Sequence, residues 1–328
     1  MAQSGIRSEL VTADVGGFAE SIARLERAVR SVIRGKDEVV KLSVVTLFAR
    51  GHLLIEDVPG VGKTTLARAL ACSFNCGFQR IQFTSDLLPS DVIGTSIYSL
   101  ETQRFEFRPG PIFTNIVLAD EINRTTPKTQ SALLEAMNEY QVTVEKVTYP
   151  LPEPFLVIAT QNPIEHHGTY PLPESQLDRF LLRARMGYPS SASEREILKG
   201  LAGRDPLAAI EPVMTSEEVI AIQRAVRGVA VDEDLVTYTL GIVEKTRQHE
   251  YLSLGVSPRG SVSLYRAAQA LALVEGRGYC IPDDFKRLAL PVLAHRCVVS
   301  SRYASTLKQS EQAEAVLREI IDSTPVPL

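Results

Sequence analysis

A glycine-rich loop, DVPGVGKTT at 57 to 65, ends on a lysine and two threonines. Such a loop can turn its backbone N–H groups toward one anion, and the helix after it adds the partial positive charge of its N-terminus. Gly60 and Gly62 permit the tight turn. Lys63 can then reach the β- and γ-phosphates of a nucleotide, and the Thr64 hydroxyl can bind Mg²⁺. The residues expected to bind the nucleotide here are Asp57, Val58, Pro59, Gly60, Val61, Gly62, Lys63, Thr64 and Thr65.

Two carboxylates follow a later apolar run, in the stretch IVLADEINR. Phosphoryl transfer needs a metal that neutralises charge and a group that orients the attacking water. Asp120 would hold Mg²⁺ through water, and Glu121 would be the base that polarises the nucleophile. The two acids would otherwise only cap the next helix, but Thr126-Pro127 is a better helix start. Asn162, which ends the run FLVIATQNP, could present its amide to the γ-phosphate or to the water.

Two arginines are candidates for contact with the same phosphates. Arg179 in ESQLDRFLL precedes a further strand, and Arg259 in GVSPRGSVSL lies in the first turn of a helix. The planar fork of arginine suits phosphate oxygens, and a helix N-terminus favours the same anion. Arg259 is therefore a candidate sensor of the nucleotide. Spacing alone, however, favours ordinary solvated surface charges for both arginines.

Short apolar runs of strand character must position these groups. Helical patterns separate several of the runs, which lie at 53 to 55, 78 to 83, 116 to 119, 155 to 159 and 180 to 182. Short, nearly all-apolar strands that alternate with helices predict a parallel sheet covered on both faces. Two alternating stretches, 95 to 107 and 140 to 151, predict hairpins inserted into that scheme.

The chain divides into three expected parts. An amphipathic helix at 18 to 32 leads in, and strand signals vanish after the break YPSSAS at 188 to 193. We expect a helical lead-in at 1–32, an α/β nucleotide-binding core with two inserted hairpins at 33–188, and an all-helical domain at 189–328. The fold class is therefore α/β with a C-terminal helical domain.

Composition limits the functions that remain open. With 45% hydrophobic and 23% charged residues, the chain has globular composition. No apolar run approaches the roughly 20 residues that cross a bilayer, and the N-terminus lacks the order of a secretory signal, so we expect a cytoplasmic protein without membrane insertion. A net charge of -4 argues against nucleic-acid binding across the whole surface, although a local basic patch could still exist.

Taken in order, these motifs resemble those of the AAA+ ATPases, and their fuller context resembles the MoxR family closely. The stretches that carry the likeness are LLIEDVPGVGKTTLARALA, LADEINRTTPKTQSALLEAMNE, ATQNPIEHHGTYPLPESQLDRFLL and SPRGS. The resemblance covers almost the whole chain from about residue 20. A strict phosphate loop would have glycine where this chain has Asp57, but EDVPGxGKT is the form that the loop takes in MoxR proteins.

The resemblance implies a fold and an assembly. The fold is an AAA+ P-loop NTPase core, with a parallel five-stranded sheet in the strand order fifth, first, fourth, third, second, followed by a helical lid domain. Such proteins bind ATP and Mg²⁺ and form homo-oligomeric rings, usually hexamers, with ATP between neighbouring subunits. The stretches 95 to 107 and 140 to 151 match the helix-2 insertion and the pre-sensor 1 hairpin, which would face the pore or a client.

The resemblance also implies residue roles. By motif match, Asn162 corresponds to sensor 1, and Arg179 to the finger that reaches a neighbour's γ-phosphate. Arg259 corresponds to sensor 2, which could act on its own nucleotide or on a neighbour's. Ile33 and Gly35 lie where the family packs the adenine.

The implied function is that of an ATP-hydrolysing ring chaperone. MoxR proteins help partner proteins to mature, including by metal-cofactor insertion, often alongside proteins with a von Willebrand A domain. A nucleic-acid motor or loader is an alternative, and a nucleotide-gated scaffold with little turnover is another. The hairpin segments SLETQR and TVEKVT carry as many acids as bases, whereas a hairpin that tracks a nucleic-acid strand should be basic with interleaved aromatics. We therefore expect protein partners and no nucleic acid.

Overall fold

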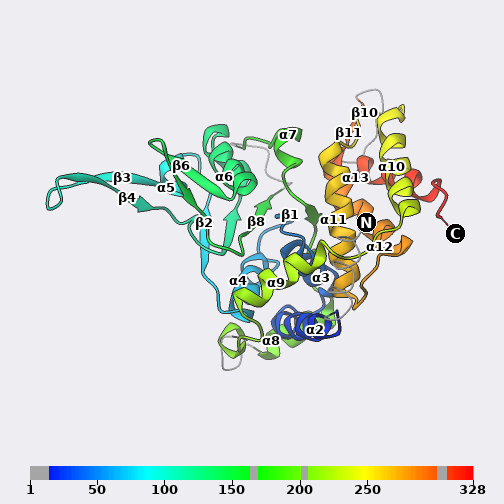
Figure 1. Ribbon diagram of the computed structural model, residues 1–328, viewed down its shortest axis with the longest axis horizontal. Helices are drawn as coiled ribbons and strands as arrows, with labels where there is room; N and C mark the ends of the chain where they lie inside the picture. The colour runs from blue at the N-terminus through cyan, green and yellow to red at the C-terminus, as the bar shows by residue number, and fades with distance from the viewer. Residues whose placement is uncertain (1–14, 163–168, 201–205, 301–308, 328) are drawn as a thin grey trace, which may run out of the picture.

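A five-stranded parallel sheet forms the centre of the molecule (Figure 1). The computed structural model describes residues 15–162, 169–200, 206–300 and 309–327. The sheet order is β2-β5-β8-β1-β9, which confirms the order expected from the resemblance. Its strands are β1 (Leu53–Glu56), β2 (Phe78–Gln82), β5 (Ile116–Asp120), β8 (Leu156–Gln161) and β9 (Leu182–Ala184).

Alternate residues of the central strands enter two different hydrophobic clusters. Leu53 and Ile55 of β1 belong to one cluster with residues of α3 and α4, whereas Leu54 belongs to the other with residues of α6. Because side chains alternate across a strand, both faces of the sheet are covered at β1, and the central strands β1, β5 and β8 are mostly apolar. The helices concerned are α2 (Val15–Val32), α3 (Asp37–Phe48), α4 (Lys63–Ser73) and α6 (Pro127–Glu139).

Two hairpins extend from the core, as the sequence predicted (Figure 1). Their strands are β3 (Gly94–Ser99) with β4 (Arg104–Pro109), after the short helix α5 (Pro89–Ile93), and β6 (Gln141–Val144) with β7 (Val147–Pro150). The rings of Phe107 and Tyr149 stack with centroids 4.1 Å apart. This contact ties the two hairpins to each other.

Helices dominate the rest of the chain, which we call the lid. They are α8 (Ser191–Gly200), α9 (Ser216–Val226), α10 (Glu233–Gln248), α11 (Pro258–Val274), α12 (Pro282–Leu293) and α13 (Gln309–Asp322). The Thr215 side chain accepts from the backbone N–H of Glu218, and the Ser257 hydroxyl accepts from that of Gly260, so the two residues cap α9 and α11. The sequence did not reveal one short antiparallel ladder, β10 (Leu252–Leu254) with β11 (Val298–Val299).

The remaining elements are short. They are the helix α7 (Glu174–Leu177) and the 3₁₀ turns η1 (Ile122–Arg124), η2 (Pro206–Ala209) and η3 (Ala294–Arg296). Within the described ranges, no helix has the length and apolar character needed to cross a membrane.

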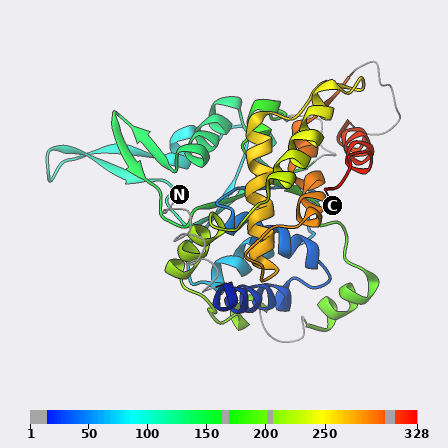
Figure 2. The ribbon, with the colours of Figure 1, turned by 45° about the vertical axis from the view of Figure 1, so that its right-hand side comes forward.

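The core and the lid share one hydrophobic cluster. Helices α9 and α11 both pack against α3, and Figure 2 shows the long helix α11 beside the sheet. The side-chain amide of Gln223 donates to the carbonyl oxygen of Leu47 at 2.7 Å. Residues of α3, β1 and α4 lie in the same cluster as residues of α9 to α13. The lid therefore packs directly against the core. The domain boundary between residues 188 and 189 stays a prediction.

A buried histidine joins α6 to the sheet. The Val157 backbone N–H donates to His52 Nδ1 at 3.0 Å, and His52 Nε2 lies 2.9 Å from the carbonyl oxygen of Met137. Nδ1 is thus an acceptor and Nε2 the donor, so the ring is neutral. Burial lowers the pKa of His52 to about 4.

The substitution His52→Gln tests this neutral state. An exposed imidazole has a pKa of 6.5, so as the pH falls toward 4 the unfolded chain takes up a proton that the folded chain refuses, and stability decreases. Between about pH 7.5 and about pH 5.5, His52 should remove about 1 kcal/mol from the free energy of unfolding. Urea denaturation should show a decrease smaller by that amount in the variant; an equal decrease in both proteins would contradict the assignment.

Candidate active site

The glycine-rich loop connects the end of β1 to the start of α4. Gly60 and Gly62 have φ values of +83° and +98°, which favour glycine, and a Cβ added at Gly60 would meet nothing within 4 Å. The loop therefore faces open space with its backbone. Lys63 Nζ donates to the carbonyl oxygens of Asp57 at 2.8 Å and Val58 at 3.2 Å. These neutral acceptors hold the ammonium at the mouth of the loop.

Asp57 supports the loop from behind. Its Oδ1 accepts from the Val58 backbone N–H at 2.8 Å, and its Oδ2 accepts from the Gly187 backbone N–H at 2.5 Å. Gly187 lies between β9 and the lid, with φ +63°. The carboxylate thus fastens the loop to the connection with the lid. Neither Asp57 nor Val58 lines the cavity in front of the loop.

The two acids face the loop across a cavity of about 340 Å³. The Thr160 hydroxyl donates to Asp120 Oδ1 at 2.6 Å and accepts from the Glu121 backbone N–H at 2.8 Å. Glu121 has φ +58°, a left-handed conformation that is uncommon for residues other than glycine. A buried threonine on β8 therefore fixes the place where β5 ends. The lining residues are Pro59, Gly60, Gly62, Lys63, Thr64, Thr65, Arg80, Asp120, Glu121 and Asn162.

Two side chains of β2 hold the acids in this structure. Arg80 donates to Asp120 Oδ2 through Nη2 at 2.6 Å, and the Gln82 amide donates to Glu121 Oε2 at 2.7 Å. The register pairs Gln82 with Asp120. Sequence reasoning missed Arg80, Gln82 and Thr160. Each of the three is a polar residue on a strand, and its partner can be predicted only when the neighbouring strand is known.

A second cavity of about 370 Å³ adjoins the first. It shares Gly60, Gly62 and Thr65 with the loop cavity, and Ile33, Val61 and several other apolar side chains line it. Gly35 lies beside this cavity with φ +69°, and a Cβ there would clash with the Ser193 side chain of α8. Glu196 and Ile197 of α8 line the cavity. Its apolar walls suit a planar base.

The two adjoining cavities fit ATP and Mg²⁺. Backbone N–H groups, the N-terminus of α4 and Lys63 supply positive charge on one side, and Asp120 and Glu121 supply carboxylates on the other. Burial lowers the pKa of Lys63, while Asp120, Asp57 and Glu121 oppose that shift. Thr64 and Asp120 would hold Mg²⁺, because hydroxyl and carboxylate oxygens are the ligands that this ion prefers.

The two arginines lie apart from this site. Arg179 and Arg259 line a different cavity of about 200 Å³ between core and lid. The side-chain amide of Asn138, oriented with its oxygen toward Arg179, accepts hydrogen bonds from Arg179 Nη1 at 3.0 Å and from Arg179 Nε at 3.1 Å. Burial, followed by the charge of Arg259, lowers the pKa of Arg179. The structure thus brings both arginines together but does not bring them to the phosphate loop.

A buried ion pair positions these arginines. Arg296 Nε donates to Asp178 Oδ1 at 2.8 Å, and its Nη2 donates to the Phe180 carbonyl at 2.5 Å. The Ser257 hydroxyl, which caps α11, also donates to Asp178 Oδ2 at 3.0 Å. Asp178 precedes Arg179 in the chain. The network therefore joins the turn that contains Arg179 to the N-terminus of α11, where Arg259 lies.

The fold and the site together define an AAA+ P-loop NTPase. Residues 52–182 match the model of the ATPase family associated with various cellular activities (AAA), and residues 244–320 match that of the AAA lid domain. The chain belongs to the MoxR family of AAA+ ATPases.

Individual relatives resemble the chain over nearly its whole length. It is 54% identical to Uncharacterized protein YeaC of Bacillus subtilis over 92% of this chain and 93% of that protein. It is 41% identical to Chaperone MoxR1 of Mycobacterium tuberculosis over 95% of this chain and 84% of that protein. The crystal structure of a candidate ATPase from Cytophaga hutchinsonii superposes with a TM-score of 0.89 at 35% identity, covering 98% of this chain and 99% of the other.

The substitution Lys63→Ala tests the phosphate loop. Removing the ammonium leaves the triphosphate without its nearest positive side chain, so ATP affinity should fall by at least about 100-fold, or about 2.7 kcal/mol. Titration of a fluorescent ATP analogue measures this. Arg68→Ala, an exposed position further along α4, is the matched control and should bind as the wild type does. Retained affinity in Lys63→Ala would remove the loop from the nucleotide site.

Proposed function

We propose that the protein hydrolyses ATP in a ring, at sites that each combine two subunits. The position of Arg179 relative to the strands of the sheet supports this proposal. Strands β1 and β9 are parallel neighbours, the phosphate loop follows the carboxyl end of β1, and Arg179 precedes the amino end of β9. The two groups therefore lie at opposite edges of one sheet. An arginine finger at that edge can reach the nucleotide of a neighbouring subunit if the chain forms a homo-oligomer.

Within one site, different residues of the chain bind the phosphates and activate the attacking water. The loop and Lys63 bind the phosphates, while Glu121 accepts the proton of the attacking water and Asn162 orients that water. Bound Mg²⁺ supplies neutralisation of phosphate charge. Glu121 must first leave Gln82, and Asp120 must leave Arg80, before either is available to the nucleotide complex. Arg179 and Arg259 come from the neighbouring subunit, so for Arg259 we propose action in trans.

Protein clients suit the hairpins better than nucleic acid does. Large apolar side chains are exposed on β3, on β4 and in the turn between them, including Ile97 at 51%, Leu100 at 85% and Phe105 at 69%. The charges of this hairpin balance, with Arg104 and Arg108 against two glutamates. Exposed apolar groups of this kind mark contacts with proteins. The 95 to 107 hairpin is thus proposed as the client contact.

The finer functional assignments follow from the family. We propose a hexameric ring in the cytoplasm that remodels or matures partner proteins, with metal-cofactor insertion as one such task. A protein with a von Willebrand A domain is the proposed partner. Chaperone MoxR1, a relative of this chain, supports a chaperone role by its name.

The substitution Glu121→Gln separates a hydrolysing chaperone from a nucleotide-gated scaffold. The amide cannot accept the proton of water, so steady-state ATP hydrolysis by concentrated protein should fall at least about 100-fold while ATP stays bound. Partner proteins retained by the ATP-bound variant should be released from the wild type as it hydrolyses. Equal, very slow hydrolysis in both proteins would favour the scaffold.

The substitution Arg179→Ala tests whether the finger acts between subunits. Its loss should leave ATP affinity unchanged and slow hydrolysis by about 1000-fold, as for fingers in other NTPases. Mixing Arg179→Ala with Glu121→Gln subunits should restore part of the hydrolysis, because a neighbour then brings Arg179 to an intact Glu121. Unchanged turnover in Arg179→Ala would point to another finger, such as Arg124, which lies 3.3 Å from Glu121 Oε2 of its own subunit. No recovery on mixing would contradict action in trans.

A further inference from the structure

Helix α8 differs from the other helices of the lid in how little of it is buried. Each of the helices α9 to α13 buries apolar side chains, whereas every residue from 191 to 199 is exposed except the half-buried Ser193. Figure 2 shows α8 at the lower right, away from α9 and α11. A helix of about ten residues is marginal in water without tertiary packing. The position of α8 therefore depends on a small number of contacts.

Two polar contacts join α8 and the chain just before it to one short segment of the core, residues 34–36. Arg34 Nη1 donates to Glu196 Oε2 at 2.9 Å, in an ion pair between positions 162 residues apart. Lys36 Nζ donates to the carbonyl oxygen of Tyr188 at 2.6 Å. The segment that precedes α3 thus holds α8 against the core mainly through charged side chains.

The ion pair lies at the apolar cavity that adjoins the loop cavity. Arg34 and Glu196 both line this cavity, so their contact joins its core wall to its lid wall. Ile33 and Val61 line it from the core, and Ile197 of α8 lines it from the lid with 44% of its surface exposed. A planar group that entered the cavity would remove part of this apolar surface from water.

The rest of the lid can keep its place when α8 moves. Residues of α9 to α13 share one hydrophobic cluster with α3, but none of the residues 191–199 belongs to either cluster. None of them lines the loop cavity either. Movement of α8 would therefore change the contacts of the base and leave the contacts of the phosphates as they are.

We propose that α8 is a clamp on the base of the nucleotide, and that the ion pair between Arg34 and Glu196 holds the clamp in place. The proposal rests on the nucleotide site proposed above and adds what controls release from it. A base between Ile33 and Ile197 buries apolar surface on both of its faces. Release of the nucleotide requires α8 to move away, and the ion pair opposes this movement.

Charge reversal at the ion pair tests the clamp. Glu196→Arg places two cations side by side, so release of a fluorescent ADP analogue should accelerate at least about threefold, within the range of an exposed ion pair. Arg34→Glu should have a similar effect. The double variant Arg34→Glu with Glu196→Arg restores opposite charges and should release the analogue nearly as slowly as the wild type. Stopped-flow fluorescence measures these rates. Both side chains are exposed, so the variants should fold.

Two comparisons show whether the effect is specific to the base. Glu211→Arg, the same change at an exposed lid position outside the cavity, is the matched control and should not accelerate release. Inorganic tripolyphosphate has no base, so its affinity should not fall in Glu196→Arg, whereas the affinity for ATP should.

A tryptophan reporter gives an independent measurement, because the chain contains no tryptophan. Ile197→Trp places a single indole at the cavity, where a bound base can stack on it. ATP should quench its fluorescence and tripolyphosphate should not. Leu198→Trp, at the next position and outside the cavity lining, is the control and should respond less.

The outcomes separate this inference from the proposed function. A wild-type protein that binds neither ATP nor tripolyphosphate would refute the nucleotide site itself. Normal ATP binding with equal release rates in the wild type and both single variants would refute only the clamp. Faster release that the double variant does not reverse would show that the two charges do not act as a pair. Fluorescence of Ile197→Trp that ATP leaves unchanged would place the base elsewhere and overturn the inference.

Discussion

The placement of an ammonium group opposite two carboxylates, across one cavity, is the constraint on which the rest of the site depends. Lys63 and the acid pair, Asp120 with Glu121, are more than fifty residues apart in sequence, yet they line one cavity. Parallel strands bring them together, because β1 and β5 both flank β8 and end at the same edge of the sheet. The mostly apolar central strands, the two hydrophobic clusters and the helices on each face hold that edge in place.

The charged groups of the site are held by neighbouring polar groups of the chain. Lys63 is held by two carbonyl oxygens, Asp120 by Arg80, and Glu121 by Gln82. Each of these contacts satisfies a buried or half-buried polar group that would otherwise lack a partner. These contacts join the loop, the acid pair and β2 into one network. Asp57 carries the loop's position on to Gly187, where the chain enters the lid.

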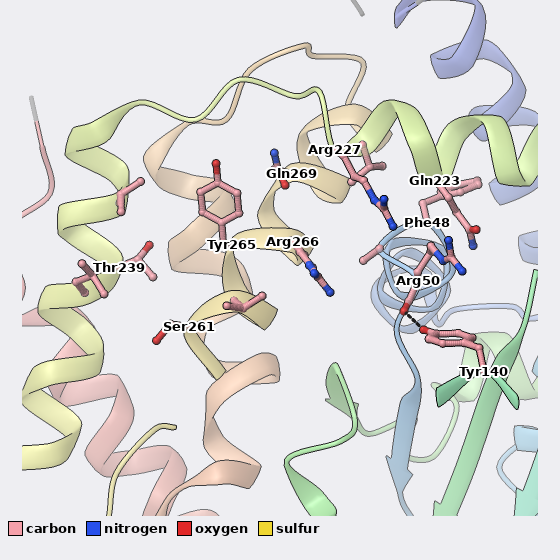
Figure 3. A pocket seen from close by; sticks show the side chains of 15 residues that line it. Phe48, Arg50, Tyr140, Gln223, Arg227, Thr239, Ser261, Tyr265, Arg266 and Gln269 are labelled. Atoms are coloured by element: carbon pink, nitrogen blue, oxygen red, sulfur yellow. Dashed lines mark hydrogen bonds between the residues drawn. The ribbon is translucent and has the colours of Figure 1, made fainter. Parts of the chain in front are cut away.

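The arginine side of the molecule shows the complementary arrangement. The buried Arg296 fastens the turn before β9 to the lid, and thereby sets Arg179 beside Arg259. A cavity of about 650 Å³ next to them is walled by both core and lid (Figure 3). In the proposed ring, the acids at one edge of the sheet and the arginines at the other would make two copies complementary where one is incomplete.

The sequence by itself determined the strands of the central sheet, the glycine-rich loop and the position of the acid pair at a strand end, because each depends on neighbours in the chain. Apolar runs and glycine at positive φ act over a few residues. Only the tertiary structure decided that Arg80, Gln82 and Thr160 hold the acids, that Asp57 fastens the loop rather than lining the cavity, and that Arg179 and Arg259 lie away from Lys63. Those contacts depend on the strand order and on the position of the lid against the core. Both arise from packing between distant segments, so the local sequence contains no pattern that predicts them.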